Sequence, residues 1–155
     1  MMRDTISKRL NKAFYVDGSL RDIYVLGTTL GDWQKLLAFL RASAYSVEFI
    51  VAGEVRSLPE SIEEVFALVH KHGGMVRVDE KNLALHCYFY TYDEMEFDLD
   101  PRAINSVQQL SRLLDFIRTI GNLLKKPVIL TPENVSRVVL FRFDPATMSE
   151  EWLLE

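Results

Sequence analysis

The chain has 155 residues, with 18 Lys and Arg against 22 Asp and Glu and a formal net charge of −4 at pH 7. Hydrophobic residues make up 48% of the sequence and charged residues 26%, which excludes an intrinsically disordered chain, while 7 glycines and 5 prolines exclude collagen-like and low-complexity proteins. We therefore expect one globular domain over residues 1–155, with a hydrophobic core of its own.

Cysteine content and charge narrow the class of protein further. The single cysteine, Cys87, excludes an internal disulfide framework and a cysteine-rich zinc site, and a reducing cytoplasm is its natural compartment. The mild acidity argues against nucleic acid as a direct partner, because non-specific phosphate binding needs a strongly basic surface. Charged residues interrupt every long apolar run, so we expect neither a transmembrane segment nor a membrane partner.

Positive charge is concentrated at the N-terminus. Residues 1–15 hold four cations and one acid, so they carry a net +3 and the rest of the chain carries −7. Ile6, Leu10 and Phe14 recur at every fourth position of this segment. That spacing predicts an amphipathic helix or arm within residues 1–19 that packs against the domain.

Apolar spacing and turn residues predict the remaining elements. One helix follows Thr29, a credible N-cap with Asp32 three residues on; a second has Pro59 near its start, and the third and longest opens at Pro101. Hairpins are interspersed among these helices, which favours a two-layer α+β fold with a mixed, mostly antiparallel sheet of about seven strands and three main helices. The predicted strands cover residues 22–26, 47–52, 54–56, 75–78, 83–90, 95–99, 128–130 and 138–143.

The two predicted strands on either side of Asp93 form the most informative segment. Five acids lie in the eight residues from Asp93 to Asp100. Because side chains alternate along a strand, the apolar residues of each strand share one face and the polar residues share the other. The polar face of this hairpin consists of His86, Tyr88, Tyr90, Glu96 and Asp98.

The register of this hairpin follows if its two apolar faces are required to coincide. A two-residue loop at Asp93 and Glu94 would place apolar side chains opposite acids. A loop of three or five residues centred on Asp93 instead pairs Phe89 with Phe97 and places tyrosines opposite acids. The longer loop is therefore the predicted one.

The polar face has three interpretations. In the first it is the solvated side of a hairpin, followed by a helix with Asp100 as its N-cap. In the second it is a recognition surface, on which tyrosines supply rigid contact area and carboxylates attract a basic partner. In the third, His86, Glu96 and Asp98 bind Mg, Mn or Zn for hydrolysis, although their spacing matches no recognised metal motif.

We expect the second interpretation: a small non-enzymatic protein, without cofactor or catalytic residues, that binds a basic protein as an inhibitor, adaptor or toxin-immunity protein would. A metal-dependent hydrolase is the competing class. Self-association through Trp33 and Trp152 also stays open, since Trp152 lies outside the predicted elements. Arg137 and Arg142 are candidates to pair with the acidic hairpin. The partner-binding residues are predicted to be His86, Tyr88, Tyr90, Asp93, Glu94, Glu96 and Asp98.

Overall fold

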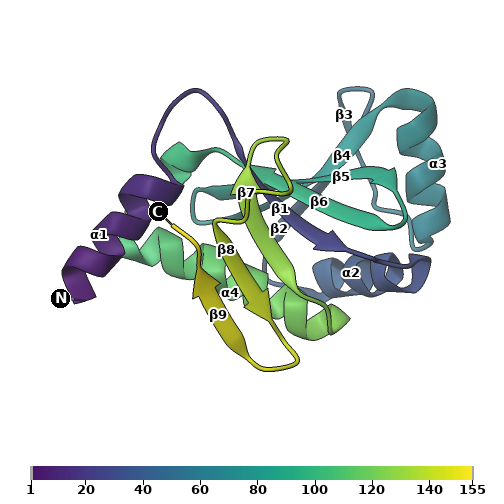
Figure 1. Ribbon diagram of the computed structural model, residues 1–155. Helices are drawn as coiled ribbons and strands as arrows, with labels where there is room; N and C mark the ends of the chain where they lie inside the picture. The colour runs from purple at the N-terminus through teal and green to yellow at the C-terminus, as the bar shows by residue number, and fades with distance from the viewer. Residues whose placement is uncertain (1, 155) are drawn as a thin grey trace.

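The computed structural model describes the backbone of residues 2–154, and within this range the chain forms nine strands. They are β1 (Arg21–Leu26), β2 (Ser46–Val51), β3 (Glu54–Arg56), β4 (Gly74–Glu80), β5 (Leu83–Thr91), β6 (Glu94–Leu99), β7 (Val128–Pro132), β8 (Phe141–Asp144) and β9 (Ser149–Trp152). All of them belong to one sheet of order β3-β2-β4-β5-β6-β1-β7-β8-β9 (Figure 1).

Every pairing of neighbouring strands in residues 2–154 is antiparallel. The α+β class is therefore confirmed, but the sheet has nine strands where about seven were expected, and it has no parallel pair in the described chain. The helices of this part of the chain are α1 (Met2–Ala13), α2 (Leu30–Ala42), α3 (Ile62–His72) and α4 (Val107–Leu124), with a short 3-10 helix η1 (Pro101–Ala103).

Local sequence explains where α2 begins. The Thr29 hydroxyl accepts a hydrogen bond from the Asp32 backbone N–H at 3.2 Å, and the Asp32 carboxylate accepts one from the Thr29 N–H at 2.9 Å. This reciprocal capping box satisfies two backbone donors that the first turn of a helix leaves unpaired. The carboxylate also forms an ion pair with Lys126 at 2.9 Å, so the same residue joins α2 to the segment after α4.

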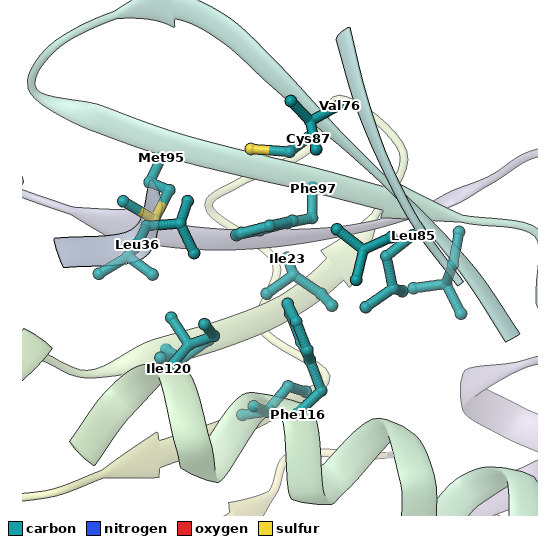
Figure 2. Close-up of a cluster of buried hydrophobic side chains, with 14 of the residues drawn as sticks. Ile23, Leu36, Val76, Leu85, Cys87, Met95, Phe97, Phe116 and Ile120 are labelled. Atoms are coloured by element: carbon teal, nitrogen blue, oxygen red, sulfur yellow. The ribbon is translucent and has the colours of Figure 1, made fainter. Parts of the chain in front are cut away.

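The hydrophobic core lies between one face of the sheet and the helices α2, α3 and α4. Figure 2 shows Phe116 and Ile120 of α4 pointing toward Ile23 and Phe97 of the sheet. The Phe97 and Phe116 rings meet edge to face with centroids 5.2 Å apart. Cys87 is fully buried in this core, and burial raises the pKa of its thiol well above the usual range, which suits an inert packing residue.

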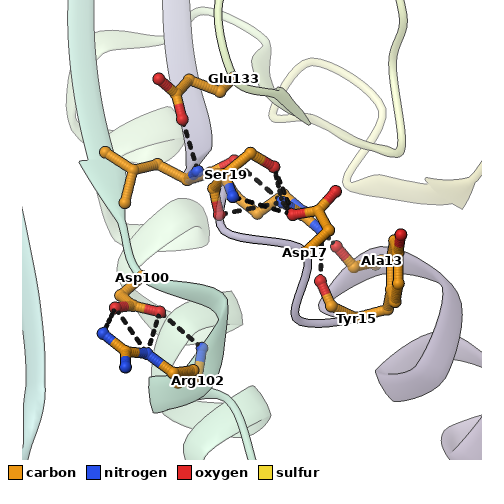
Figure 3. A network of polar contacts seen from close by, with 9 residues as sticks. Ala13, Tyr15, Asp17, Ser19, Asp100, Arg102 and Glu133 are labelled. Carbon is orange, nitrogen blue, oxygen red and sulfur yellow. Dashed lines mark hydrogen bonds and ion pairs between the residues drawn. The ribbon is translucent and has the colours of Figure 1, made fainter.

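A buried arginine attaches α1 to the sheet. Arg21, at the start of β1, is only 4% exposed and holds the segment between α1 and β1 in place. Figure 3 labels Ala13, Tyr15, Asp17 and Ser19 of this segment. Its Nε donates to the Ala13 carbonyl at 2.6 Å and its Nη2 to the Tyr15 carbonyl at 2.7 Å. Its Nη1 donates to the Leu20 carbonyl at 2.9 Å. One guanidinium group therefore satisfies carbonyls on both sides of the turn.

Two expectations about the second half of the chain are wrong. Pro101 does not open the longest helix: η1 comes first, with Asp100 as its cap, and α4 begins only after Ser106, whose hydroxyl accepts from the Gln109 N–H. Trp152 is not outside the regular elements, because it lies in β9 and its ring packs 4.7 Å from that of Phe141.

Trp33, the second residue considered for self-association, is also unsuited to that role. Its side chain is fully buried in the core, and its Nε1 donates to the Tyr92 carbonyl at 2.9 Å. Trp33 is therefore not an exposed anchor, whereas Trp152 is partly exposed and packs on Phe141. None of the helices in residues 2–154 has the combined length and apolar character that crossing a bilayer requires.

Candidate functional site

The structure places the predicted polar residues of β5 and β6 on one face of the sheet, opposite the core. His86 lies across from Asp98, and Tyr88 lies across from Glu96. The rings of Tyr88 and Tyr90 stack with centroids 5.6 Å apart and planes 4° from parallel. The term acidic–aromatic face is used below for this surface and its turn, which comprise His86, Tyr88, Tyr90, Asp93, Glu94, Glu96 and Asp98.

The predicted register is wrong by two residues. Phe97 pairs with Cys87 instead of Phe89, and the loop is a two-residue turn at Tyr92 and Asp93. An irregularity between Tyr88 and Thr91 adds one residue to β5, as a β-bulge does. The extra residue keeps the apolar side chains of β5 and β6 on the same face of the sheet although the loop is short. The grouping of side chains by face therefore survives the error in register.

The turn is held by contacts that the sequence pattern does not reveal. The Asp93 carbonyl accepts from the N–H groups of Gly27 and Thr28 at 2.9 and 3.2 Å, in the loop that joins β1 to α2. The Thr28 hydroxyl and the Trp33 indole both donate to the Tyr92 carbonyl. These long-range bonds fix the turn, so the hairpin adopts a bulge rather than a longer loop.

Strand β1 adds two residues to the site that were not among the predicted ones. Tyr24 lies across from Glu96, and Asp22 lies across from Asp98. The Tyr24 hydroxyl is 3.0 Å from Asp22 Oδ2 and 3.0 Å from Glu96 Oε1. Alternation within β1 could have assigned both side chains to a polar face, but nothing in the local pattern indicates that β1 pairs with β6.

The hydroxyl of Tyr24 has one proton for two neighbouring carboxyl groups. Burial raises the pKa of Asp22 and of Glu96, and burial together with these carboxylates raises the pKa of Tyr24, which therefore stays protonated. The Asn134 N–H donates to Asp22 Oδ2 at 2.7 Å and stabilises the ionised form of that carboxylate. Both carboxyl groups therefore take up a proton at a higher pH than an ordinary carboxyl group does.

This arrangement makes the stability of the fold depend on the charge of Glu96. A raised pKa means that ionised Glu96 destabilises the folded state at high pH. This cost disappears below the ordinary carboxyl pKa, because Glu96 is then protonated in both the folded and the unfolded protein. We expect Glu96→Gln to raise the free energy of unfolding by about 1 kcal/mol at neutral pH. Urea denaturation between pH 4 and 8 should show this gain shrinking toward the acid end.

Glu94→Gln is the matched control, because Glu94 lies on the same face of β6 but has no hydrogen bond to Tyr24. Its effect should be small and should not follow the pattern of Glu96→Gln. A Glu96→Gln gain that is equal at every pH, or a loss at neutral pH, would contradict the shared-proton arrangement.

The acidic character of the surface is smaller than the sequence suggested. Asp22 is only 2% exposed and Asp98 only 9%. Asp98 Oδ1 lies 3.2 Å from His86 Nδ1, and Asp100 is paired with Arg102. The turn residue Asp93 is the exposed acid, and Glu94 beside it is partly exposed.

The arginines that were expected to pair with the acidic hairpin do not do so in the described part of the chain. Among the side chains of residues 5–154, neither Arg137 nor Arg142 forms an ion pair with the hairpin. Arg77 of β4 lies across from His86 and pairs with Asp79 at 3.0 Å. A charge-compensated pair therefore borders the acidic–aromatic face on the β4 side.

Metal coordination receives no support from the geometry. Within residues 5–154, no group of three or more His, Cys, Asp or Glu side chains is arranged so that it could hold a metal ion. Of the three proposed ligands, Glu96 is hydrogen-bonded to Tyr24, and His86 faces Asp98 as a pair.

Comparisons with protein-family models, with curated proteins and with solved structures found no match to this chain.

Proposed function

We propose that this protein is a small binding module that recognises a basic protein through its acidic–aromatic face. The observation that carries the proposal is the stacked pair of Tyr88 and Tyr90, with Tyr90 63% exposed beside the acids of the turn. A large aromatic side chain exposed on a regular sheet leaves apolar area in water that a partner can cover. The sheet holds these rings in place before any partner arrives.

The two kinds of residue on this face have different tasks. The exposed Tyr90 and the Tyr88 ring stacked on it provide contact area at low cost in conformational entropy, which is why tyrosine is common at binding hot spots. Asp93 and Glu94 lie at the rim, where carboxylates accelerate encounter with a basic surface more than they strengthen the final complex. The buried Asp22 and Asp98 support the face instead of contacting the partner.

Within this class, we favour a cytoplasmic inhibitor, adaptor or immunity protein. Such proteins act by covering a functional surface of the partner, so they need no catalytic group or cofactor. Such proteins usually bind their partners through rigid aromatic contacts and associate with them under the guidance of charge.

The proposal is tested by capturing partners from the native cell with the purified protein, then measuring the dissociation constant of the recovered partner. We expect a basic partner whose association slows as salt is raised. Tyr88→Ala combined with Tyr90→Ala should weaken binding by about 30-fold, as the loss of hot-spot aromatic residues does. Tyr15→Ala is the control, because Tyr15 is exposed but lies before β1, outside the face.

The result that overturns the proposal is a partner that binds the double variant as tightly as the wild type. An association rate that is independent of salt would remove the role assigned to the carboxylates. Circular dichroism of the double variant shows whether the fold is retained, since both tyrosines lie on the solvent side of β5.

A further inference from the structure

A hollow of about 490 Å³ lies between the turn of β4 and β5, the 3-10 helix η1 and the first turns of α4. It is separate from the acidic–aromatic face, and the inference drawn from it goes beyond the proposed function. It is called here the basic hollow, and its polar lining consists of Lys81, Asn82, Arg102, Asn105, Gln109 and Arg112.

The charge of the basic hollow is opposite to that of the whole chain. Three cations line it and no acid does, in a chain whose formal net charge is −4. Arg102 is neutralised in part by Asp100, but among the side chains of residues 5–154 neither Lys81 nor Arg112 has an acidic partner. Two uncompensated positive charges therefore face the same space.

The neutral polar groups of the basic hollow add further donors. Gln109 is only 8% exposed, and its Oε1 accepts a hydrogen bond from Arg112 Nη1. With its oxygen engaged in this way, the carboxamide has its NH₂ group left, and this group can only donate. Donors thus outnumber acceptors in the lining, which is the condition for binding an anion.

Several contacts fix the positions of these residues in advance. Lys81 and Asn82 form the two-residue turn between β4 and β5 with φ of 48° and 68°, as a tight hairpin turn requires. Arg102 is held by Asp100, whose Oδ2 is 2.6 Å from Nη2 and 3.0 Å from Nε. Asn105, Gln109 and Arg112 follow one face of the chain as it enters α4.

We propose that the basic hollow binds a phosphate group, either free or carried by a small molecule. A phosphate monoester carries close to two negative charges and three acceptor oxygens, which matches two uncompensated cations and a surplus of donors. A single carboxylate would leave part of this lining unpaired. The volume exceeds what one phosphate fills, and it lies within the range of small-molecule sites, so the carboxamides have room to contact the rest of the ligand.

The test is an NMR titration of the ¹⁵N-labelled protein with inorganic phosphate, ribose 5-phosphate and unphosphorylated ribose. We expect saturable shifts centred on residues 81–82 and 105–112 with the two phosphorylated probes and none with ribose. Lys81→Gln combined with Arg112→Gln should weaken binding by about tenfold or more, because each removes a charge-assisted contact. Arg56→Gln combined with Lys71→Gln removes the same charge at exposed sites elsewhere and should leave the affinity unchanged.

The outcomes separate cleanly. Tighter binding of ribose 5-phosphate than of inorganic phosphate supports the proposal and identifies a phosphate monoester as the ligand class; equal binding supports it with free phosphate as the ligand. Absence of saturable shifts up to about 20 mM, in the range of very weak affinity, overturns it. Equal weakening by both double variants also overturns it, since this would be non-specific attraction between charges.

Discussion

Replacing Arg21 with leucine should lower the free energy of unfolding by about 3 kcal/mol. The guanidinium is nearly fully buried and donates to the carbonyls of Ala13, Tyr15 and Leu20, none of which leucine can satisfy. Each unsatisfied buried acceptor carries a desolvation penalty, and the segment between α1 and β1 loses its main attachment. Urea denaturation followed by circular dichroism measures the change.

Limited trypsin digestion adds a local test of the Arg21→Leu variant. If α1 loosens, cleavage after Lys12, which lies in its last turn, should become faster than in the wild type. Arg56→Leu is the control, because Arg56 is exposed on β3 and the same substitution there removes no buried contact. Equal midpoints of denaturation for Arg21→Leu and the wild type would show that the hydrogen bonds of the Arg21 guanidinium do not stabilise the fold.

Gly74→Ala should also cost about 3 kcal/mol, for a different physical reason. A Cβ atom at this position of β4 would lie 2.2 Å from the Ile50 carbonyl oxygen and 3.2 Å from the Val51 Cα, both of which belong to the backbone of β2. Backbone atoms in a paired strand cannot move aside as a flexible side chain can. The two strands must separate where Val51 pairs with Gly74.

The same substitution at Gly31 provides the control for Gly74→Ala. Gly31 lies in the first turn of α2, where an added Cβ meets only the Thr29 hydroxyl oxygen at an ordinary 3.6 Å. Alanine is the better helix former, so Gly31→Ala should be neutral or stabilising by up to about 1 kcal/mol. Thermal denaturation of both variants decides the matter, and similar melting temperatures for the two would contradict the close approach of β4 to β2.

Local patterns predicted the parts of the structure that depend on local physics. The capping box of Thr29 and Asp32 was found because it is contained within four residues. The grouping of His86, Tyr88 and Glu96 on one face followed from alternation, which holds whatever the register of the hairpin. These features needed no knowledge of which strands are neighbours.

Features set by distant parts of the chain could not be found in this way. The contribution of Tyr24 depends on β1 pairing with β6, and the buried Asp22 accepts a hydrogen bond from the N–H of Asn134 in the loop after β7. Strand β9 was missed because its residues are mostly polar and exposed, so that it lacks the alternation of a half-buried strand. Asp22 shows that a charged residue, which the sequence alone would place on the surface, can lie inside the fold.

The position of β1 in the sheet has a consequence for the order of events during folding. It lies between β6 and β7, and the hydrogen bond from Tyr24 to Glu96 spans 72 residues. Strand β1 can therefore pair only after β6 and β7 have left the ribosome. Closing such long loops is the slow step in sheets with high contact order. The acidic–aromatic face therefore gains the support of Tyr24 only when most of the chain has been synthesised, and a truncated chain ending before β6 lacks both the hairpin and the site.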